Sequence, residues 1–275
     1  MRLLGLGDNT VDTYVDHGEQ YPGGNALNVA VLARRLGAEA AYLGCFGSDE
    51  GGDILRVALA AEQVDISRCR HRSGENARAF IGHKKGDRKF LTARAGVRAD
   101  YRFDSADFDY IALFDHVHTS IFSEIDLLLP QLRQKASQVS YDFSEHWSRD
   151  LLKSVLPHID IPCLSAPRLT EHELDELIDF CRKQGASRGL VTQGVRGATA
   201  WYCGRVLRQP SIPVEVVDTL GAGDGFIAAF LMASIAGKGL DEALTSGARF
   251  AALVCGWKGA FGRGAEWRGE RPVLS

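Results

Sequence analysis

The chain has 275 residues, of which 45% are hydrophobic and 24% charged, and its formal net charge is −3. These totals are typical of a soluble globular protein and argue against a nucleic-acid partner. No stretch reaches the roughly 18 apolar residues of a membrane span. The six scattered cysteines form no CxxC motif, so we expect reduced thiols in a cytoplasmic protein with no membrane partner.

The first half of the chain alternates between apolar strands and amphipathic helices. The expected strands are 2–6 and 40–46, and the expected helices are 26–36 and 54–63. Such β-α alternation with short loops predicts an α/β fold, a doubly wound and mainly parallel sheet with helices on both faces.

Residues 76–101 interrupt this alternation. Two strand-like runs, 78–81 and 89–92, flank a polar tip at 83–87, which is the pattern of an antiparallel hairpin. A hairpin inserted in a parallel α/β chain often covers the site as a lid. We therefore expect a single domain, residues 1–275, with a small β lid from about 13–21 and 76–101.

The alternation then resumes to the end of the chain. The remaining predicted strands are 110–118, 139–143, 159–164 and 189–192, with a hairpin over 198–207. The remaining predicted helices are 125–133, 171–184 and 240–254. We expect the tail from Gly262 onward, which is rich in Gly, Arg and Glu, to be loose.

Polar residues follow the first strand and open the first helix. Asp8 and Asp12 come just after the strand, where ligands bind in open parallel sheets, although acids in a solvated turn would look the same. Asn28 lies in the first turn of an apolar helix, where it either caps the backbone or holds a ligand hydroxyl. Gly24 would let a ligand approach the main chain.

The stretch from Asp218 to Phe230, DTLGAGDGFIAAF, places three small residues before an acid and an apolar helix. Free amides of Gly221, Ala222 and Gly223 at a helix start form an anion site, and Asp224 beside them is suited to act as a base in phosphoryl transfer. An ordinary helix start with Asp224 as a first-turn acid has the same composition. The segment is not a P-loop, since GxxxxGK[ST] is absent.

Two motifs together resemble the ribokinase-like (PfkB-type) carbohydrate kinases. One is the di-glycine motif GGNALN from Gly23 to Asn28, and the other is DTLGAGDGF from Asp218 to Phe226. Matching both motifs in order is highly specific. The resemblance covers nearly the whole chain and implies a ribokinase-like fold and ATP-dependent phosphorylation of a sugar hydroxyl.

The resemblance also implies roles for single residues. Asp224 would be the catalytic base, and the amides of Gly221, Ala222 and Gly223 would form the anion hole. Asp8, Asp12, Gly24 and Asn28 would bind the acceptor. Thr192 and Gly194 would bind the nucleotide with Gly221 and Gly223. Asp218 and Thr219 match the place where many members bind a monovalent cation such as K⁺, and Mg²⁺ would arrive with ATP.

Within the family, the chain looks most like the fructoselysine 6-kinase group. The carriers are GDNTVD (residues 7–12), the short spacing before GGNALNVAV (23–31), and YDFSEHW (141–147). The family's NxxE motif is not found around Ser165 to Glu171. The missing motif leaves open a catalytically impaired protein that only binds sugar and ATP. A nucleoside kinase of the same family also stays open. The sequence also leaves open whether the lid closes against a second copy in a homodimer.

Overall fold

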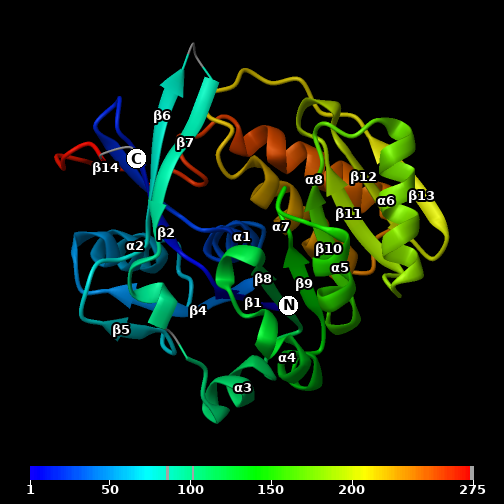
Figure 1. Cartoon of the computed structure of the whole chain (residues 1–275), viewed down its shortest axis with the longest axis horizontal. Coiled ribbons are helices and arrows are strands. Elements are labelled where there is room, and N and C mark those ends of the chain that lie inside the picture. Colours follow the sequence, from blue (N-terminus) through cyan, green and yellow to red (C-terminus); the bar gives the residue numbers. More distant parts are fainter. Residues whose placement is uncertain (85–86, 101, 273–275) are drawn as a thin grey trace.

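The computed structural model describes residues 1–84, 87–100 and 102–272. Within them, most strands belong to one large sheet. These strands are β1 (Arg2–Gly7), β4 (Glu39–Gly47), β5 (Arg70–Arg72), β8 (His116–Ser120), β9 (Val139–Asp142), β10 (Ile161–Ser165), β11 (Arg188–Thr192), β12 (Ala198–Tyr202) and β13 (Arg205–Gln209). Their order is β13-β12-β11-β10-β9-β8-β1-β4-β5 (Figure 1). All neighbours from β11 to β5 are parallel, which confirms the predicted α/β class.

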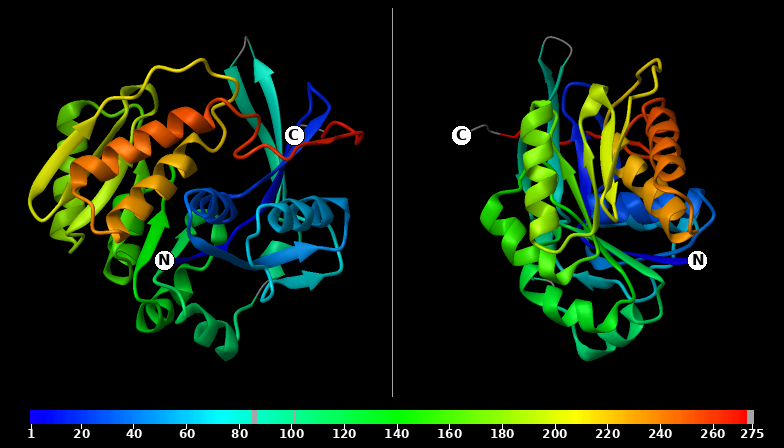
Figure 2. Two further views of the ribbon diagram at one scale, coloured as in Figure 1. Left: turned by 180° about the vertical axis from the view of Figure 1, so that it is seen from behind. Right: turned by 90° about the vertical axis from the view of Figure 1, so that its right-hand side faces the viewer.

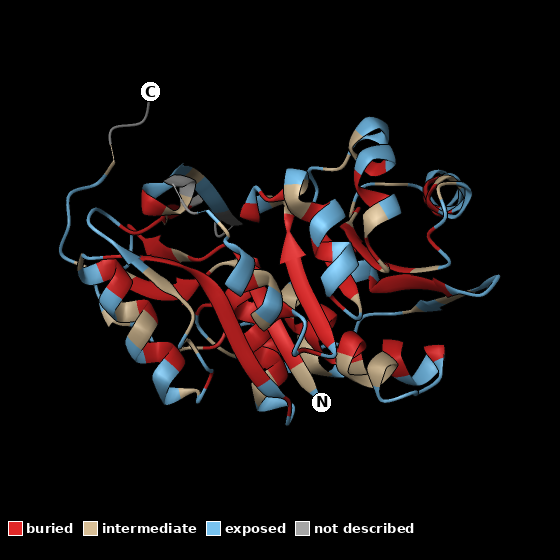
Figure 3. Ribbon diagram, turned by 90° about the horizontal axis from the view of Figure 1, so that it is seen from below, coloured by how far each residue is buried: buried red, intermediate tan, exposed pale blue. Residues whose placement is uncertain are grey.

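Helices cover both faces of this sheet (Figure 2). One face carries α1 (Asn25–Arg35), α2 (Glu50–Ala61), α7 (Ala222–Ile235) and α8 (Leu240–Val254). The other carries α3 (Ser105–Ile111), α4 (Leu129–Lys135), α5 (Arg149–Val155) and α6 (Glu171–Lys183). Side chains alternate across a strand, so Leu3 packs into the first core and Leu4 into the second. Buried residues accordingly line the strands and the inner sides of the helices (Figure 3).

A second, smaller sheet stands beside the edge where the parallel strands end. It consists of β2 (Thr10–Tyr14), β3 (Glu19–Gly23), β6 (Arg78–Lys84), β7 (Asp87–Arg94) and β14 (Ala265–Glu266), in the order β14-β3-β2-β6-β7. The predicted hairpin is β6 and β7, and its turn at Lys85 and Gly86 lies outside the described residues. That this sheet acts as a lid stays a prediction.

Two sequence predictions need correction, and one helix was missed. Tyr110 was expected to begin a strand, but it belongs to α3, which starts at a capping box formed by Asp104 and Asp107, and β8 begins only at His116. The helix α5 was not predicted. The tail is not wholly loose, because β14 pairs with β3, so that Trp267 donates its backbone N–H to the Gly18 carbonyl at 2.7 Å. None of the helices in the described ranges has the length and apolar content that a membrane span requires.

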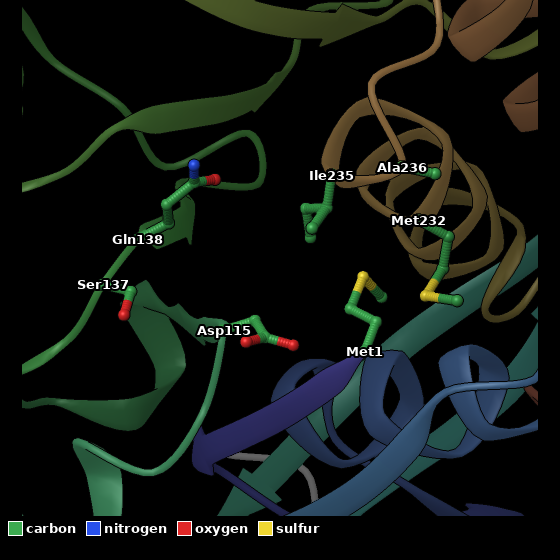
Figure 4. A pocket seen from close by; sticks show the side chains of 7 residues that line it. All are labelled: Met1, Asp115, Ser137, Gln138, Met232, Ile235 and Ala236. Atoms are coloured by element: carbon green, nitrogen blue, oxygen red, sulfur yellow. The ribbon is translucent and has the colours of Figure 1, made fainter.

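A pocket of about 520 Å³ opens at the opposite edge of the large sheet (Figure 4). Its lining residues precede β1, β8 and β9 or end α7; they are Met1, Asp115, Ser137, Gln138, Met232, Ile235 and Ala236. In parallel α/β sheets ligands bind at the carboxyl ends of the strands. This pocket lies at the amino ends, on the side of the sheet opposite to the expected ligand site.

Candidate active site

Polar residues gather where the parallel strands end. Asp8 directly follows β1, Ser120 ends β8, Asp142 ends β9 and Thr192 ends β11. Because these strands are parallel, all four residues lie at one edge of the large sheet. The helices α1 and α7 also begin at this edge and pack against each other. The two sequence motifs therefore meet in space.

The N-terminus of α7 is open to solvent. Gly221 precedes the helix with φ of 78°, and a Cβ there would lie 2.5 Å from the Ala260 Cα, so only glycine fits. Gly223, in the first turn, is exposed, and a Cβ added to it would meet no atom within 4 Å. Among the described residues no side chain caps this helix. The Ala222 backbone N–H already donates to the Thr219 carbonyl at 3.3 Å, so the exposed amide of Gly223 and the helix dipole are what this helix start offers an anion.

Asp224 lies in the same first turn and is held by two asparagines of α1. Its Oδ1 accepts a hydrogen bond from Asn25 Nδ2 at 2.7 Å, and its Oδ2 accepts one from Asn28 Nδ2 at 2.6 Å. Asn25 and Asn28 are one helical turn apart and so share a face. The structure therefore brings the predicted base Asp224 into contact with Asn28, a predicted acceptor ligand.

A second carboxylate, Asp142, lies on the far side of Asn25. Its Oδ2 accepts from Asn25 Nδ2 at 2.8 Å and its Oδ1 from the Ser144 backbone N–H at 2.8 Å. Burial raises the pKa of Asp142 to about 7, and the negative charges of Asp224 and Asp8 add to this rise. The carboxylates of Asp142 and Asp224 therefore flank the side-chain amide of Asn25.

The raised pKa of Asp142 predicts a pH-dependent stability. Because the folded-state pKa, about 7, lies above the unfolded value of about 4, folding holds this carboxyl protonated, and stability falls as pH rises through that window. The loss should amount to a few kcal/mol. As pH rises from about 5 to about 8, we expect the melting temperature of Asp142→Asn to rise relative to that of the wild type. A difference in melting temperature that stays constant across this range would contradict the shift.

Asp8 supports the start of α1. Its Oδ1 accepts from the Ala26 backbone N–H at 3.1 Å, from Ser120 Oγ at 2.7 Å and from Ser123 Oγ at 3.0 Å, and the residue is 2% exposed. Gly24, the residue before α1, has φ of 108°, and a Cβ there would lie 2.5 Å from the Asn9 Cα. The predicted roles of both residues in acceptor binding are not tested by these contacts.

The small sheet contributes Asp12 and Tyr14. Asp12, on β2, is 4% exposed and packs so tightly on Gly23 that a Cβ there would lie 1.9 Å from its Oδ2. The Tyr14 hydroxyl donates to Asp218 Oδ2. Asp218 also accepts from the backbone N–H groups of Leu220 at 2.9 Å and of Gly259 at 3.0 Å. A hydrogen bond thus joins the small sheet to the turn that leads into α7.

The predicted nucleotide residues lie at the same edge, further along the sheet. Thr192 ends β11, two strands beyond Asp142, and its Oγ1 donates to the Leu164 carbonyl at 3.3 Å. Gly194 follows with φ of 58°. The role of both residues in nucleotide binding stays a prediction.

Sequence reasoning gave no role to Asn25, Asp142, His118 or Ser140. In the structure Asn25 contacts Asp224, and the other three residues connect to it through Asn25. Asn25 stands next to the recognised glycines, and Asp142 ends a predicted strand, so their positions carried a signal. The signal for His118 was its place in β8, where a polar residue recurs at every second position. Alternating polar residues in a buried strand indicate a polar network on one face.

The sequence of the chain is similar to those of known kinases. Residues 3–264 match the model of the pfkB family of carbohydrate kinases. The chain is 40% identical over 274 residues to fructosamine kinase FrlD of Bacillus subtilis (strain 168), covering 98% of this chain and 96% of that protein. It is 35% identical over 263 residues to fructoselysine 6-kinase of Escherichia coli (strain K12), covering 94% and 99%.

Among solved structures, the Arabidopsis thaliana ribokinase complexed with ribose and ATP has the same fold. The TM-score is 0.85 at 22% identity, over 95% of this chain and 96% of that one. The ribokinase-like architecture predicted from the two motifs is therefore confirmed. Since the family match spans nearly the whole sequence and the relatives are matched over almost their full length, this chain belongs to the pfkB family of carbohydrate kinases.

Proposed function

We propose that this protein transfers the γ-phosphate of ATP to a primary hydroxyl of a sugar-amine conjugate, a fructosamine of the fructoselysine type. The observation that carries the proposal is the position of Asp224, beside the open amide of Gly223 and in contact with Asn28. Asp224 takes the proton of the acceptor hydroxyl. The amides of Gly221, Ala222 and Gly223 stabilise the charge that develops on the transferred phosphate.

The acceptor binds between the small sheet and the start of α1. Asn28 is 4% exposed, and its Oδ1 is buried without a hydrogen-bond partner among the described residues. A buried acceptor without a donor is costly, and a sugar hydroxyl would supply the donor. In this proposal Asp12, Gly24 and Asp8 complete the acceptor site. A carboxylate offers about four lone pairs, so Asp224 can hold both asparagines and still accept a proton.

The donor nucleotide binds along Thr192 and Gly194 and reaches the α7 amides with its phosphates. Within residues 1–84, 87–100 and 102–272 there is no group of three or more His, Cys, Asp or Glu that would hold a metal. This suits Mg²⁺ carried by the phosphates and water, where it would neutralise charge on the phosphate oxygens. A K⁺ ion at Asp218 and Thr219 would share a carboxylate that already accepts three hydrogen bonds.

The proposed substrate class follows the two relatives, whose names refer to fructosamine and fructoselysine. The test is ADP release from ATP with fructoselysine, fructose, ribose and nucleosides as acceptors, followed by ³¹P NMR of the product. We expect the highest kcat/KM with fructoselysine and a phosphate ester on its primary hydroxyl. Preference for a nucleoside would replace the proposal with a nucleoside kinase, and tight binding without ADP would indicate a binding protein.

The missing NxxE motif is the argument for the alternative that this chain only binds sugar and ATP. Arg168 stands in that neighbourhood and pairs with Glu145 at 3.0 Å, while Glu171 pairs with Arg208 at 2.9 Å. The turnover number obtained in the proposed ADP-release assay would decide between an active kinase and a binding protein. We also propose a cytoplasmic location, where the six free cysteines would stay reduced, and a homodimer, which light scattering tests.

A further inference from the structure

The amide of Asn25 lies between two carboxylates. Its Nδ2 donates to Asp224 Oδ1 at 2.7 Å and to Asp142 Oδ2 at 2.8 Å. An ionised carboxylate only accepts hydrogen bonds, so the Asp224 base requires the N–H side of this amide. The orientation of the amide is thereby fixed, and Asn25 Oδ1 must face the opposite way.

Asn25 Oδ1 faces His118 in β8, with His118 Nε2 at 2.9 Å. An amide oxygen needs a donor, so His118 carries its proton on Nε2 and its Nδ1 accepts. Ser140 Oγ lies 2.7 Å from this Nδ1 and must donate to it. Ser140 Oγ in turn lies 2.7 Å from His116 Nε2, which donates to it. Each of the three hydrogen bonds that link His116, Ser140, His118 and Asn25 thus has one defined donor and one defined acceptor.

The four residues are shut away from water. His116, His118 and Ser140 are 0% exposed and Asn25 is 8% exposed. Burial lowers the pKa of both histidines to about 3, so both rings are neutral at working pH, as the directed chain requires. Apolar residues of similar size would often pack here without loss of stability. Three hydrogen bonds join the four residues, and His116 Nδ1 at the far end of the chain is buried without a partner among the described residues. A polar chain kept inside the sheet core is therefore better explained by what it orients.

We propose that His118, held in its Nε2–H tautomer by Ser140, locks the amide of Asn25 and through it the carboxylate of Asp224 in the orientation that faces the acceptor hydroxyl. Asn25 and His118 are positioning residues, and this inference rests on the proposed role of Asp224 as base. Without Ser140 the His118 ring can change tautomer. The amide of Asn25 can then turn its oxygen toward Asp224, which repels the carboxylate out of place.

The first test reads the tautomers directly, without activity. In protein labelled with ¹⁵N-histidine, long-range ¹H–¹⁵N NMR correlations report which ring nitrogen carries the proton. We expect His116 and His118, assigned with His116→Gln and His118→Gln, to be neutral Nε2–H rings from about pH 6 to about pH 8. A neutral Nδ1–H ring at His118, or a ring that titrates in this range, would overturn the proposal.

The second test is kinetic. Asn25→Asp places a third carboxylate beside Asp142 and Asp224 and should lower kcat about 10²-fold. Ser140→Ala removes the donor to His118, together with the acceptor of the His116 Nε2–H group, and should lower kcat about tenfold. Since neither change touches the nucleotide, the KM for ATP should stay within about twofold of wild type.

The matched control is Thr119→Val. Thr119 is also 0% exposed, lies next to His118 in β8, and has an Oγ1 without a partner in the described structure. Its side chain points to the other face of the sheet, so kcat should stay within about twofold of wild type. Loss of kcat in Thr119→Val equal to that in Ser140→Ala would show a packing effect and refute the positioning role.

The two proposals fail in different ways. If Asp224→Asn keeps wild-type kcat, the base assignment is wrong whatever the NMR shows. If Asp224→Asn is inactive while Ser140→Ala and Asn25→Asp turn over at the wild-type rate, the function stands and the positioning chain is wrong. Melting temperatures of all variants show how much folded enzyme each measured rate refers to. The tautomer result is obtained on wild-type protein and does not depend on the stability of the variants.

Discussion

Asp224→Asn is expected to lower kcat about 10²–10⁴-fold, the range in which a positioned general base contributes to catalysis. The amide keeps the size of the carboxylate but cannot take a proton from the acceptor hydroxyl. In the wild type, Asn25 and Asn28 both donate a hydrogen bond to the Asp224 side chain. The substitution replaces one of the two acceptor oxygens with an N–H donor. We therefore expect only a modest change in melting temperature beside the large loss in kcat. The measurement is steady-state ADP release with fructoselysine and ATP.

Asp241→Asn provides the control for this change. Asp241 is an exposed acid in the first turn of α8, so it has the same relation to a helix start as Asp224 but lies outside the candidate site. Any general effect of removing a first-turn carboxylate, about 0.3–1 kcal/mol of stability, appears in both variants. Wild-type turnover in Asp224→Asn, or equal losses in both variants, would remove Asp224 from the mechanism.

Gly223→Ala is expected to uncouple stability from activity. A Cβ at Gly223 meets no atom within 4 Å, and alanine favours a helix by about 1 kcal/mol over glycine, so the melting temperature should hold or rise. The added methyl group occupies the space in front of the first-turn amides, where the phosphate would lie. We expect kcat to fall roughly 10²-fold, as when one donor to a developing anion is lost, and the KM for ATP to rise.

Gly221→Ala is the contrasting variant. Its backbone has φ of 78° and its Cβ would lie 2.5 Å from the Ala260 Cα, so the substitution should lower both the melting temperature and the rate. Isothermal titration with an ATP analogue then separates the two glycines. Undiminished nucleotide affinity and kcat in Gly223→Ala would mean that phosphate does not approach these amides.

The alternation of elements could be predicted from the sequence because its signals are local. Helix α6, for example, begins at a capping box formed by Thr170 and Glu173 and keeps an apolar stripe, and both features are visible in the sequence. Pairing between distant segments carries no such signal. The pairing of β14 with β3 joins the tail to the first hairpin, and so the tail was mistaken for a loose end.

The residues of the candidate site also fall into two groups, those with a local sequence signal and those without one. Asp224 and Asn28 were predicted because each lies in a short motif with a characteristic spacing. Asp142 and His118 were missed because their closeness to Asn25 depends on the order of parallel strands β1, β8 and β9 and on the placement of α1 above them. Strand order is set by packing of the whole sheet rather than by neighbouring residues. Only the folded chain brings these side chains together.

Under the proposed function, the hydrogen bond between Tyr14 and Asp218 would couple the binding of the acceptor to the binding of ATP. A sugar that displaces β2 must either break this bond or move the residues before α7, and a nucleotide that orders those residues acts back on β2 in the same measure, since coupling free energies are reciprocal. Cooperativity between acceptor and ATP would then arise within one chain, through the Tyr14 hydroxyl and the packing of Leu220 on the cluster of Tyr14, Tyr21 and Ile81.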